Sequence, residues 1–162
     1  MLISAIVCAL LVAANAATKD KIVQAQEDKF SKSISDTFGK ADYTTVDLSI
    51  DGIDSVTKDE NGRIIFEITA DGYAKGGLHL LIGFDNQGAV EGISFLSIDE
   101  TPGLGTKVQD DESFTEQFKG VSSADYDFSV ITGATYSSNG MKSAVDQALK
   151  AYNEHKEEIL NG

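Results

Sequence analysis

Two short turn signals most constrain how this chain folds. Each contains asparagine and glycine and separates two β-rich runs: residues 61–62 lie between 53–58 and 63–69, and residues 86–88 lie between 78–84 and 90–98. Such turns are typical of β-hairpins, because glycine tolerates the positive φ that tight connections between strands require. The sequence therefore predicts two antiparallel hairpins in the middle of the chain.

A helical periodicity near the C-terminal end predicts a long amphipathic helix that packs on this sheet. Its apolar face, with the spacing i, i+3, i+4, i+7, i+8, i+11, comprises Met141, Ala144, Val145, Ala148, Leu149 and Tyr152. Weaker patterns predict three further elements: a helix over 19–38 that ends at Gly39, a helix over 113–119 that pairs Phe114 with Phe118, and a last short strand over 126–131.

The length and composition suit one domain with a buried core. The chain has 162 residues, of which 41% are hydrophobic and 24% charged, and it carries no internal repeat or low-complexity linker. We therefore expect the fold class α+β, with antiparallel hairpins and a C-terminal helix. The domain is expected over residues 41–162, preceded by a juxtamembrane amphipathic helix over 19–40.

The charge and the inventory of metal-binding side chains exclude several classes of function. A net charge of -13 repels a phosphate backbone and anionic lipid headgroups, so nucleic-acid binding and polybasic membrane docking are excluded. The chain has one cysteine, Cys8, and two histidines, His79 and His155. This set builds neither a disulfide framework nor a zinc site, and we expect no metal.

Residues 1–18 contain no charged side chain. A helix of this length spans about 27 Å, close to a hydrocarbon core of roughly 30 Å. Two interpretations compete: a transmembrane anchor, or a signal peptide cleaved after the A-x-A sequence that ends at Ala16. Because no lysine or arginine precedes the apolar stretch, we favour the anchor. Lys19 and Lys21 are a poor guide to orientation, since long domains often cross regardless of such charges.

The segment 132–140 combines hydroxyl side chains and two glycines immediately before the predicted C-terminal helix. The N-terminus of a helix offers unpaired N–H groups and the positive end of its dipole, which favour an anion such as phosphate. The alternative is an ordinary helix cap, in which Ser137 or Ser138 accepts hydrogen bonds from the first-turn amides. This segment alone leaves both interpretations open.

Two other loops carry similar features. In the run Glu-Thr-Pro-Gly-Leu-Gly at residues 100–105, Pro102 and Gly103 predict a tight type II turn that holds Leu104 outside the core. The glycine-rich loop 71–77 carries Tyr73, whose ring is suited to stacking on a planar ligand or to ordinary packing. Neither loop identifies a ligand by itself.

Taken together, these segments resemble one family. The Gly-Tyr and Gly-Gly pairs of residues 72–77, the run at 100–105 and the sequence Thr-Gly-Ala-Thr at 132–135 are similar to the FMN-binding domain in the G subunit of the Rnf electron-transport complex. The same domain occurs in the C subunit of the sodium-translocating NADH:quinone oxidoreductase. The resemblance departs from the family pattern at Ser129, where an aspartate is usual.

The resemblance implies FMN joined covalently by a phosphoester to Thr135, attached by a flavin transferase that uses FAD. The other residues that it implies as cofactor contacts come from the same loops: Thr132, Gly133, Ala134, Ser137, Ser138, Glu100, Thr101, Gly103, Leu104 and Tyr73. Lys75 or Lys107 is expected to offset the negative charge near the flavin, and Lys107 is taken as the cofactor contact. No residue of the chain is expected to be catalytic in its own right.

The function implied is that of an electron-transfer subunit in a membrane-bound, ion-translocating ferredoxin:NAD⁺ oxidoreductase complex. Its partners would be the other membrane, iron–sulfur and flavin subunits, and the domain would lie on the extracytoplasmic side of the inner membrane. Three alternatives stay open: a free-standing extracytoplasmic flavinylated carrier, the C subunit of the quinone-reducing relative, and a non-redox tethered scaffold.

Overall fold

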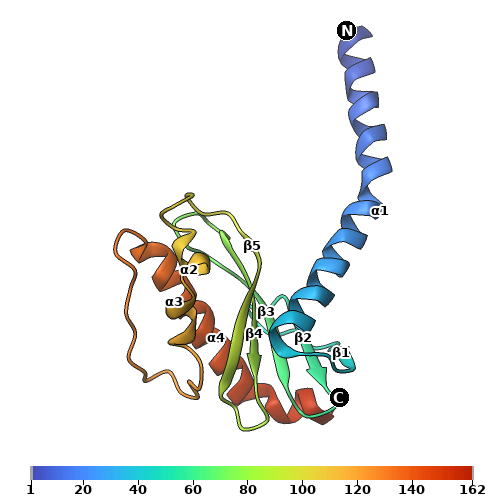
Figure 1. Ribbon diagram of the computed structural model, residues 1–162. Helices are drawn as coiled ribbons and strands as arrows, with labels where there is room; N and C mark the ends of the chain where they lie inside the picture. Colours follow the sequence, from blue (N-terminus) through green and yellow to red (C-terminus); the bar gives the residue numbers. More distant parts are fainter. Residues whose placement is uncertain (1, 162) are drawn as a thin grey trace.

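The computed structural model describes the backbone of residues 2–161 and the side chains of residues 18, 19 and 21–161 (Figure 1). Five antiparallel strands form one sheet in the order β1-β2-β3-β4-β5. The strands are β1 Tyr43–Val46, β2 Ser55–Asp59, β3 Ile64–Ala70, β4 Leu78–Phe84 and β5 Val90–Ile98. The helices are α1 Leu2–Phe38, α2 Lys107–Asp110, α3 Glu112–Glu116 and α4 Thr135–Asn161. The predicted α+β class is confirmed.

Both predicted hairpins are present, and each is closed by an aspartate at the end of its first strand. The Asp59 carboxylate accepts hydrogen bonds from the backbone amides two and four residues further on, at 2.9 and 2.8 Å. Asp85 does the same in the second hairpin, at 2.9 Å in both cases. Gly62 and Gly88 take positive φ values of 84° and 90°. Local turn chemistry therefore sets both connections.

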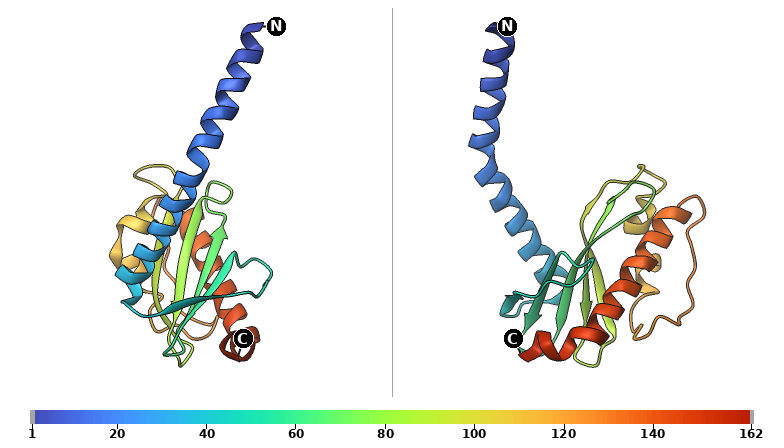
Figure 2. Two further views of the ribbon diagram at one scale, coloured as in Figure 1. Left: turned by 90° about the vertical axis from the view of Figure 1, so that its right-hand side faces the viewer. Right: turned by 180° about the vertical axis from the view of Figure 1, so that it is seen from behind.

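The helix α4 covers one face of the sheet, as the apolar periodicity predicts (Figure 2). All six residues of the predicted face are buried. They pack against alternate side chains of the two central strands, which are Ile64, Phe66, Ile68, Leu78, Leu80, Ile82 and Phe84. This layer is the main hydrophobic core.

The last turns of α1 cover the opposite face. Ile34 and Phe38 are buried against Ile65, Leu81 and Leu96 of the sheet. The helix ends as predicted, at a glycine with a φ of 85° that follows Phe38 directly. Toward its N-terminus α1 extends well beyond the sheet (Figures 1 and 2), and Ile22 on this part of the helix is exposed.

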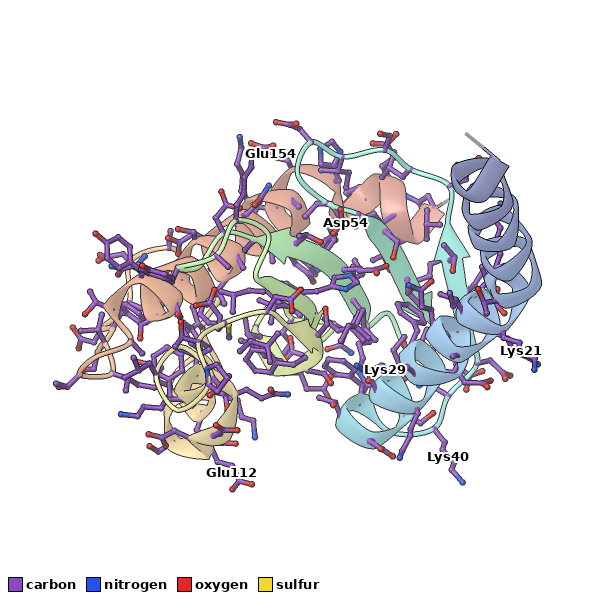
Figure 3. All side chains as sticks on the ribbon, turned by 90° about the horizontal axis from the view of Figure 1, so that it is seen from above. Lys21, Lys29, Lys40, Asp54, Glu112 and Glu154 are labelled. Carbon is purple, nitrogen blue, oxygen red and sulfur yellow. The ribbon has the colours of Figure 1, made fainter. Side chains whose placement is uncertain are left out.

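The charged side chains labelled along the outer surface of the molecule point away from the sheet. Figure 3 shows this for Lys21 and Lys40 on the α1 side and for Glu112 beside α3. Within the part of the chain whose side chains are described, no helix has a stretch both long and apolar enough to cross a membrane. Apart from Thr18, the anchor expected over residues 1–18 lies outside the residues with described side chains.

The strand expected over residues 126–131 is wrong, because this described segment is an extended loop without strand pairing. Its backbone bonds to a side chain instead: the Ser129 amide donates to Gln117 Oε1 at 2.9 Å, and Gln117 Nε2 donates to the Ser129 carbonyl at 3.3 Å. The rings of Tyr126 and Phe128 pack on α3 and the turn after it.

The helix expected over 113–119 is present in shorter form as α3, and turns continue the chain to Gly120, whose φ is 78°. The predicted contact between Phe114 and Phe118 is confirmed, with ring centroids 5.6 Å apart. The one-turn helix α2, which precedes α3, was not expected from the sequence.

Candidate functional site

Three loops that lie far apart in the sequence meet at one end of the sheet. The loop 71–77 joins β3 to β4, residues 99–106 follow β5, and residues 132–134 precede α4. All three lie at the end of the domain opposite the C-terminus, which is also the end toward which α1 extends (Figures 1 and 2). These are the loops that the sequence singles out.

The Glu100 side chain links its own loop and the loop 71–77 to the first turn of α4. It is 7% exposed, and its carboxylate accepts hydrogen bonds from the backbone amides of Tyr73 at 3.2 Å and Ala74 at 3.1 Å. The Ser137 hydroxyl, on the first turn of α4, donates to Glu100 Oε2 at 2.6 Å. Glu100 therefore points into the protein rather than toward solvent.

The turn after Glu100 has the predicted geometry. Gly103 takes a φ of 72°, and the Leu104 amide donates to the Thr101 carbonyl at 3.1 Å, as in a type II turn. The Thr106 hydroxyl accepts from the Gly103 amide at 2.9 Å. Thr101 and Gly103 are exposed, and so is the Leu104 side chain, which is held on the surface.

The Thr-Gly-Ala-Thr segment forms a tight turn into α4. The Ala134 amide donates to the Ile131 carbonyl at 2.9 Å, and Gly133 between them has a φ of 84°. Ala134 is buried, whereas Thr132 and Thr135 are exposed. The hydroxyl of Thr135, the first residue of α4, is thus presented to solvent at the start of the helix.

The two serines on the first turn of α4 have partners inside the protein. Ser138 is fully buried, and its hydroxyl accepts from the Ile131 amide at 3.1 Å. Ser137 is 2% exposed and donates to Glu100. Both side chains therefore shape the loop, and neither is aimed at a ligand on the surface.

An exposed apolar patch surrounds the start of α4. Tyr73 is 73% exposed, Tyr136 is 71% exposed, and their ring centroids lie 6.1 Å apart in an edge-to-face arrangement. Leu104 is 48% exposed, and a Cβ at Gly133 would stand 3.8 Å from its Cδ2. Tyr136 was not expected from the sequence, although an aromatic residue directly after Thr135 was a usable signal.

Lys107 follows the Leu104 turn, and its amide donates to the Leu104 carbonyl at 3.2 Å. It is the first residue of α2 and lines a shallow surface hollow with Asp110, Asp111, Glu112 and Ser113. Its near neighbours are thus acidic side chains of α2 and α3. Its expected role near the flavin stays a prediction.

A larger hollow, of about 980 Å³, lies on the other face of the sheet beside α1. On its floor His79 Nε2 lies 2.8 Å from Glu67 Oε1, and the Ser55 hydroxyl donates to Glu67 Oε2 at 2.5 Å. Lys29, whose place on α1 Figure 3 shows, is on its rim. None of the residues expected to contact the cofactor lines this hollow.

Comparison with known proteins identifies the class to which this arrangement belongs. Residues 72–150, which include the loops around Thr135 and most of α4, match the FMN-binding domain family. FMN is therefore the cofactor of the domain.

The similar proteins are the G subunits of ion-translocating oxidoreductase complexes. The chain is 31% identical to that of Aliivibrio fischeri strain MJ11 over 119 residues, which is 65% of this chain and 56% of the relative. The relative from Shewanella piezotolerans is 33% identical over 58% of this chain and 50% of its own length. The relative from Shewanella amazonensis is 28% identical over 97% of this chain and 87% of its own length. The chain thus covers about half the length of the first two relatives.

The residues at the start of α4 fit FMN. Thr135 is exposed, and within the described residues its hydroxyl has no hydrogen-bond partner, so it is available to carry a phosphate. Tyr73, Tyr136 and Leu104 offer exposed apolar surface of the kind that a flavin ring covers. Gly140 lets α4 approach the loop 71–77 closely, because a Cβ there would lie 2.3 Å from the Asp71 carbonyl oxygen.

Proposed function

We propose that the chain is the FMN-carrying electron-transfer subunit of a membrane-bound, ion-translocating oxidoreductase complex of the Rnf type. The observation that carries this proposal is the exposed Thr135 hydroxyl at the start of α4, bordered by the three loops that the family shares. The names of the relatives support the assignment to such a complex. The protein acts as a redox subunit of the complex and not as a catalyst alone.

FMN is joined to Thr135 through a phosphoester in this proposal, and a flavin transferase with FAD as donor makes the bond. Thr132, Gly133 and Ala134 form the turn that presents the hydroxyl, and Leu104 and Tyr73 border the ring. The N–H groups of the first turn of α4 favour the phosphate. When bound, the flavin supplies one- and two-electron redox chemistry, and the protein supplies placement and electrostatics.

The position of the site relative to α1 supports a role beside a membrane. The loops lie at the end of the domain toward which α1 extends (Figure 1). We propose that residues 1–18 anchor the chain and that the domain lies on the extracytoplasmic side. A covalent bond then keeps the flavin from being lost where no free flavin pool replaces it. The partners are the membrane, iron–sulfur and flavin subunits of the complex.

Intact mass measurement of the full chain, co-expressed with a flavin transferase, tests the proposal. The expected increment is FMN less one water, located on the peptide of residues 132–142 and visible as in-gel flavin fluorescence. Thr135→Ala removes both signals, whereas Thr44→Ala, a control at an exposed threonine of β1 outside the three loops, keeps them. Retention of the increment in the Thr135→Ala variant overturns the assignment of the attachment residue. An unmodified, colourless wild-type chain favours the tethered scaffold.

Two related candidates are separated by further measurements. A mature N-terminus at Ala17 in the native host favours a free-standing extracytoplasmic carrier. Co-purification with quinone-reducing subunits favours the C subunit of the sodium-translocating relative. Co-purification with ferredoxin-oxidising subunits supports the proposed Rnf-type complex.

A further inference from the structure

We propose that Glu100 is a positioning residue for the flavin, holding the Tyr73 loop against the start of α4 so that the Tyr73 ring lies beside a flavin carried by Thr135. This inference rests on the proposed function. It concerns a side chain that the sequence assigned to the cofactor surface and that the structure buries. The Glu100 carboxylate acts through the backbone of Tyr73 and not through contact with the flavin.

The carboxylate is held by three donors from two separate segments. The Tyr73 and Ala74 amides come from the loop between β3 and β4, and the Ser137 hydroxyl comes from α4. All three partners donate hydrogen, so they need an acceptor with two oxygens. A single buried side chain thus links the backbone at Tyr73 to the first turn of the helix that begins with Thr135.

Three glycines close around the same carboxylate. A Cβ would stand 2.3 Å from Glu100 Oε1 at Gly72, 2.4 Å from it at Gly77, and 2.5 Å from Oε2 at Gly105. Each distance is far shorter than a normal contact, so a side chain at any of these positions would displace the carboxylate. Gly72, Gly77 and Gly105 therefore share one explanation, which is the space taken by the Glu100 carboxylate.

The contacts of Tyr73 show how Glu100 affects the candidate site. Its backbone amide is fixed by Glu100, while its ring is exposed and meets the Tyr136 ring. Few other described contacts hold this loop at its tip, where the Gly76 amide donates to Asp71 Oδ1 at 2.7 Å within the loop itself. Without Glu100 the loop stays attached to β3 and β4, and Asp71 still packs on α4 at Gly140, but the Tyr73 amide loses its link to the first turn of α4.

Glu100→Gln is the sharpest variant, because glutamine keeps the shape but has only one acceptor oxygen. If the glutamine NH₂ group takes the place of Oε1, it faces the Ala74 N–H, and if it takes the place of Oε2, it faces the Tyr73 N–H. Either orientation puts two donors against each other, so one hydrogen bond is lost. The matched control is Asp99→Asn, which removes the same charge one residue earlier from an exposed side chain. Ser137→Ala is a milder second variant that deletes one of the three hydrogen bonds.

The test measures flavin fluorescence per attached flavin in the full chain, together with the melting temperature. An aromatic ring held against a flavin quenches its fluorescence, so we expect Glu100→Gln to raise the yield by roughly twofold or more and Asp99→Asn to leave it unchanged. Tyr73→Ala should raise the yield equally, and adding Glu100→Gln to it should change nothing further. If Glu100→Gln does not fold, Ser137→Ala should show a smaller rise in a folded protein.

The outcomes separate this inference from the function on which it rests. If the wild-type chain takes up no flavin, the proposed function itself is wrong. A wild-type chain that carries quenched flavin, with the same yield in folded Glu100→Gln, overturns the positioning role while the function stands. The same conclusion follows if the two substitutions raise the yield additively, because Glu100 would then not act through Tyr73.

Discussion

The ring of Tyr136 meets the ring of Tyr73 edge to face, with centroids 6.1 Å apart and planes inclined at 71°. One ring follows Thr135 on α4, and the other belongs to the loop between β3 and β4. Exposed apolar side chains that lie together are typical of ligand-binding or interaction surfaces. Their contact makes the surface beside Thr135 the strongest candidate for the place of the flavin ring.

Replacing Tyr136 with alanine tests this placement. Because the side chain is largely exposed, we expect the free energy of unfolding of the flavin-free chain to change by less than about 0.5 kcal/mol. In the flavin-loaded chain the same substitution should raise flavin fluorescence, since one neighbouring ring is lost. Leu160→Ala, an exposed apolar residue at the far end of α4, is the control. Unchanged fluorescence in Tyr136→Ala would place the flavin elsewhere.

The packing of α1 on the sheet requires a residue without a side chain at Gly83. Gly83 and Gly92 are partners on β4 and β5, and the Phe38 ring lies over them. A Cβ at Gly83 would stand 2.2 Å from Phe38 Cε1, whereas one at Gly92 would stand 3.4 Å or more from any side-chain atom. Gly83→Ala should therefore cost about 1–3 kcal/mol in urea unfolding.

Gly92→Ala provides the comparison for that measurement. It makes the same chemical change on the same face of the sheet, at an ordinary contact distance from Thr37 and Phe38. We expect its unfolding midpoint to stay close to that of the wild type. Equal destabilisation by both substitutions would mean that strand propensity, rather than the close contact with Phe38, accounts for the loss.

Arg63 connects the end of α1 to the sheet by hydrogen bonds. Its Nη1 donates to the Phe38 carbonyl at 2.6 Å, and its Nε and Nη2 donate to the Glu91 carboxylate at 2.5 and 2.9 Å. Burial opposes the charge, but the hydrogen bonds and attraction of Glu91 outweigh it, so the pKa of Arg63 lies above its ordinary value. A lysine keeps the charge and lacks the fork that reaches both partners.

Arg63→Lys should therefore lower the free energy of unfolding by about 1 kcal/mol. Hydrogen exchange should also speed up in the last turn of α1, where the Phe38 carbonyl loses its cationic donor. Lys119→Ala removes the exposed pair with Glu116 and should change neither quantity measurably. If Arg63→Lys matches the wild type in both measurements, the last turn of α1 is held by apolar packing alone.

Features set by nearby residues could be predicted from the sequence, and features set by distant residues could not. The hairpins at Gly62 and Gly88 and the turn at Gly103 follow from chemistry within a few residues. The buried face of α4 follows from its periodicity in the same way. By contrast, the segment 126–131 alternates like a strand, but the Gln117 side chain takes its hydrogen bonds.

The candidate site also combines features that local motifs predict with contacts between distant residues that they do not predict. Thr135 and Leu104 stand out in local motifs, and both are exposed where the three loops meet. Ser137 and Glu100 belong to the same motifs, yet they bond to each other inside the protein. The hydrogen bond between Ser137 and Glu100 joins positions 37 residues apart, and no pattern in either segment predicts it. The motifs therefore predict a candidate site, but they do not separate its surface residues from the buried residues that support them.

Tyr126 offers a prediction about alkaline pH. Burial, and next the charge of Asp146, raise the pKa of its phenol well above its ordinary value. Lys142, whose ammonium lies 4.8 Å from the Tyr126 ring centre and 2.6 Å from Asp146 Oδ2, is the other charged group at this contact. Within the described residues the Tyr126 hydroxyl has no hydrogen-bond partner. Tyr126→Phe should therefore change stability little at neutral pH.

The sign of the pH effect follows from the raised pKa. The folded protein holds the phenolic proton more tightly than the unfolded chain, whose tyrosines titrate near pH 10. This contribution to stability is complete below about pH 10 and is lost as the pH rises toward the folded-state pKa. Urea unfolding across that range should show a steeper fall for the wild type than for Tyr126→Phe. Parallel curves would mean that the Tyr126 phenol ionises as readily in the folded protein as in the unfolded chain.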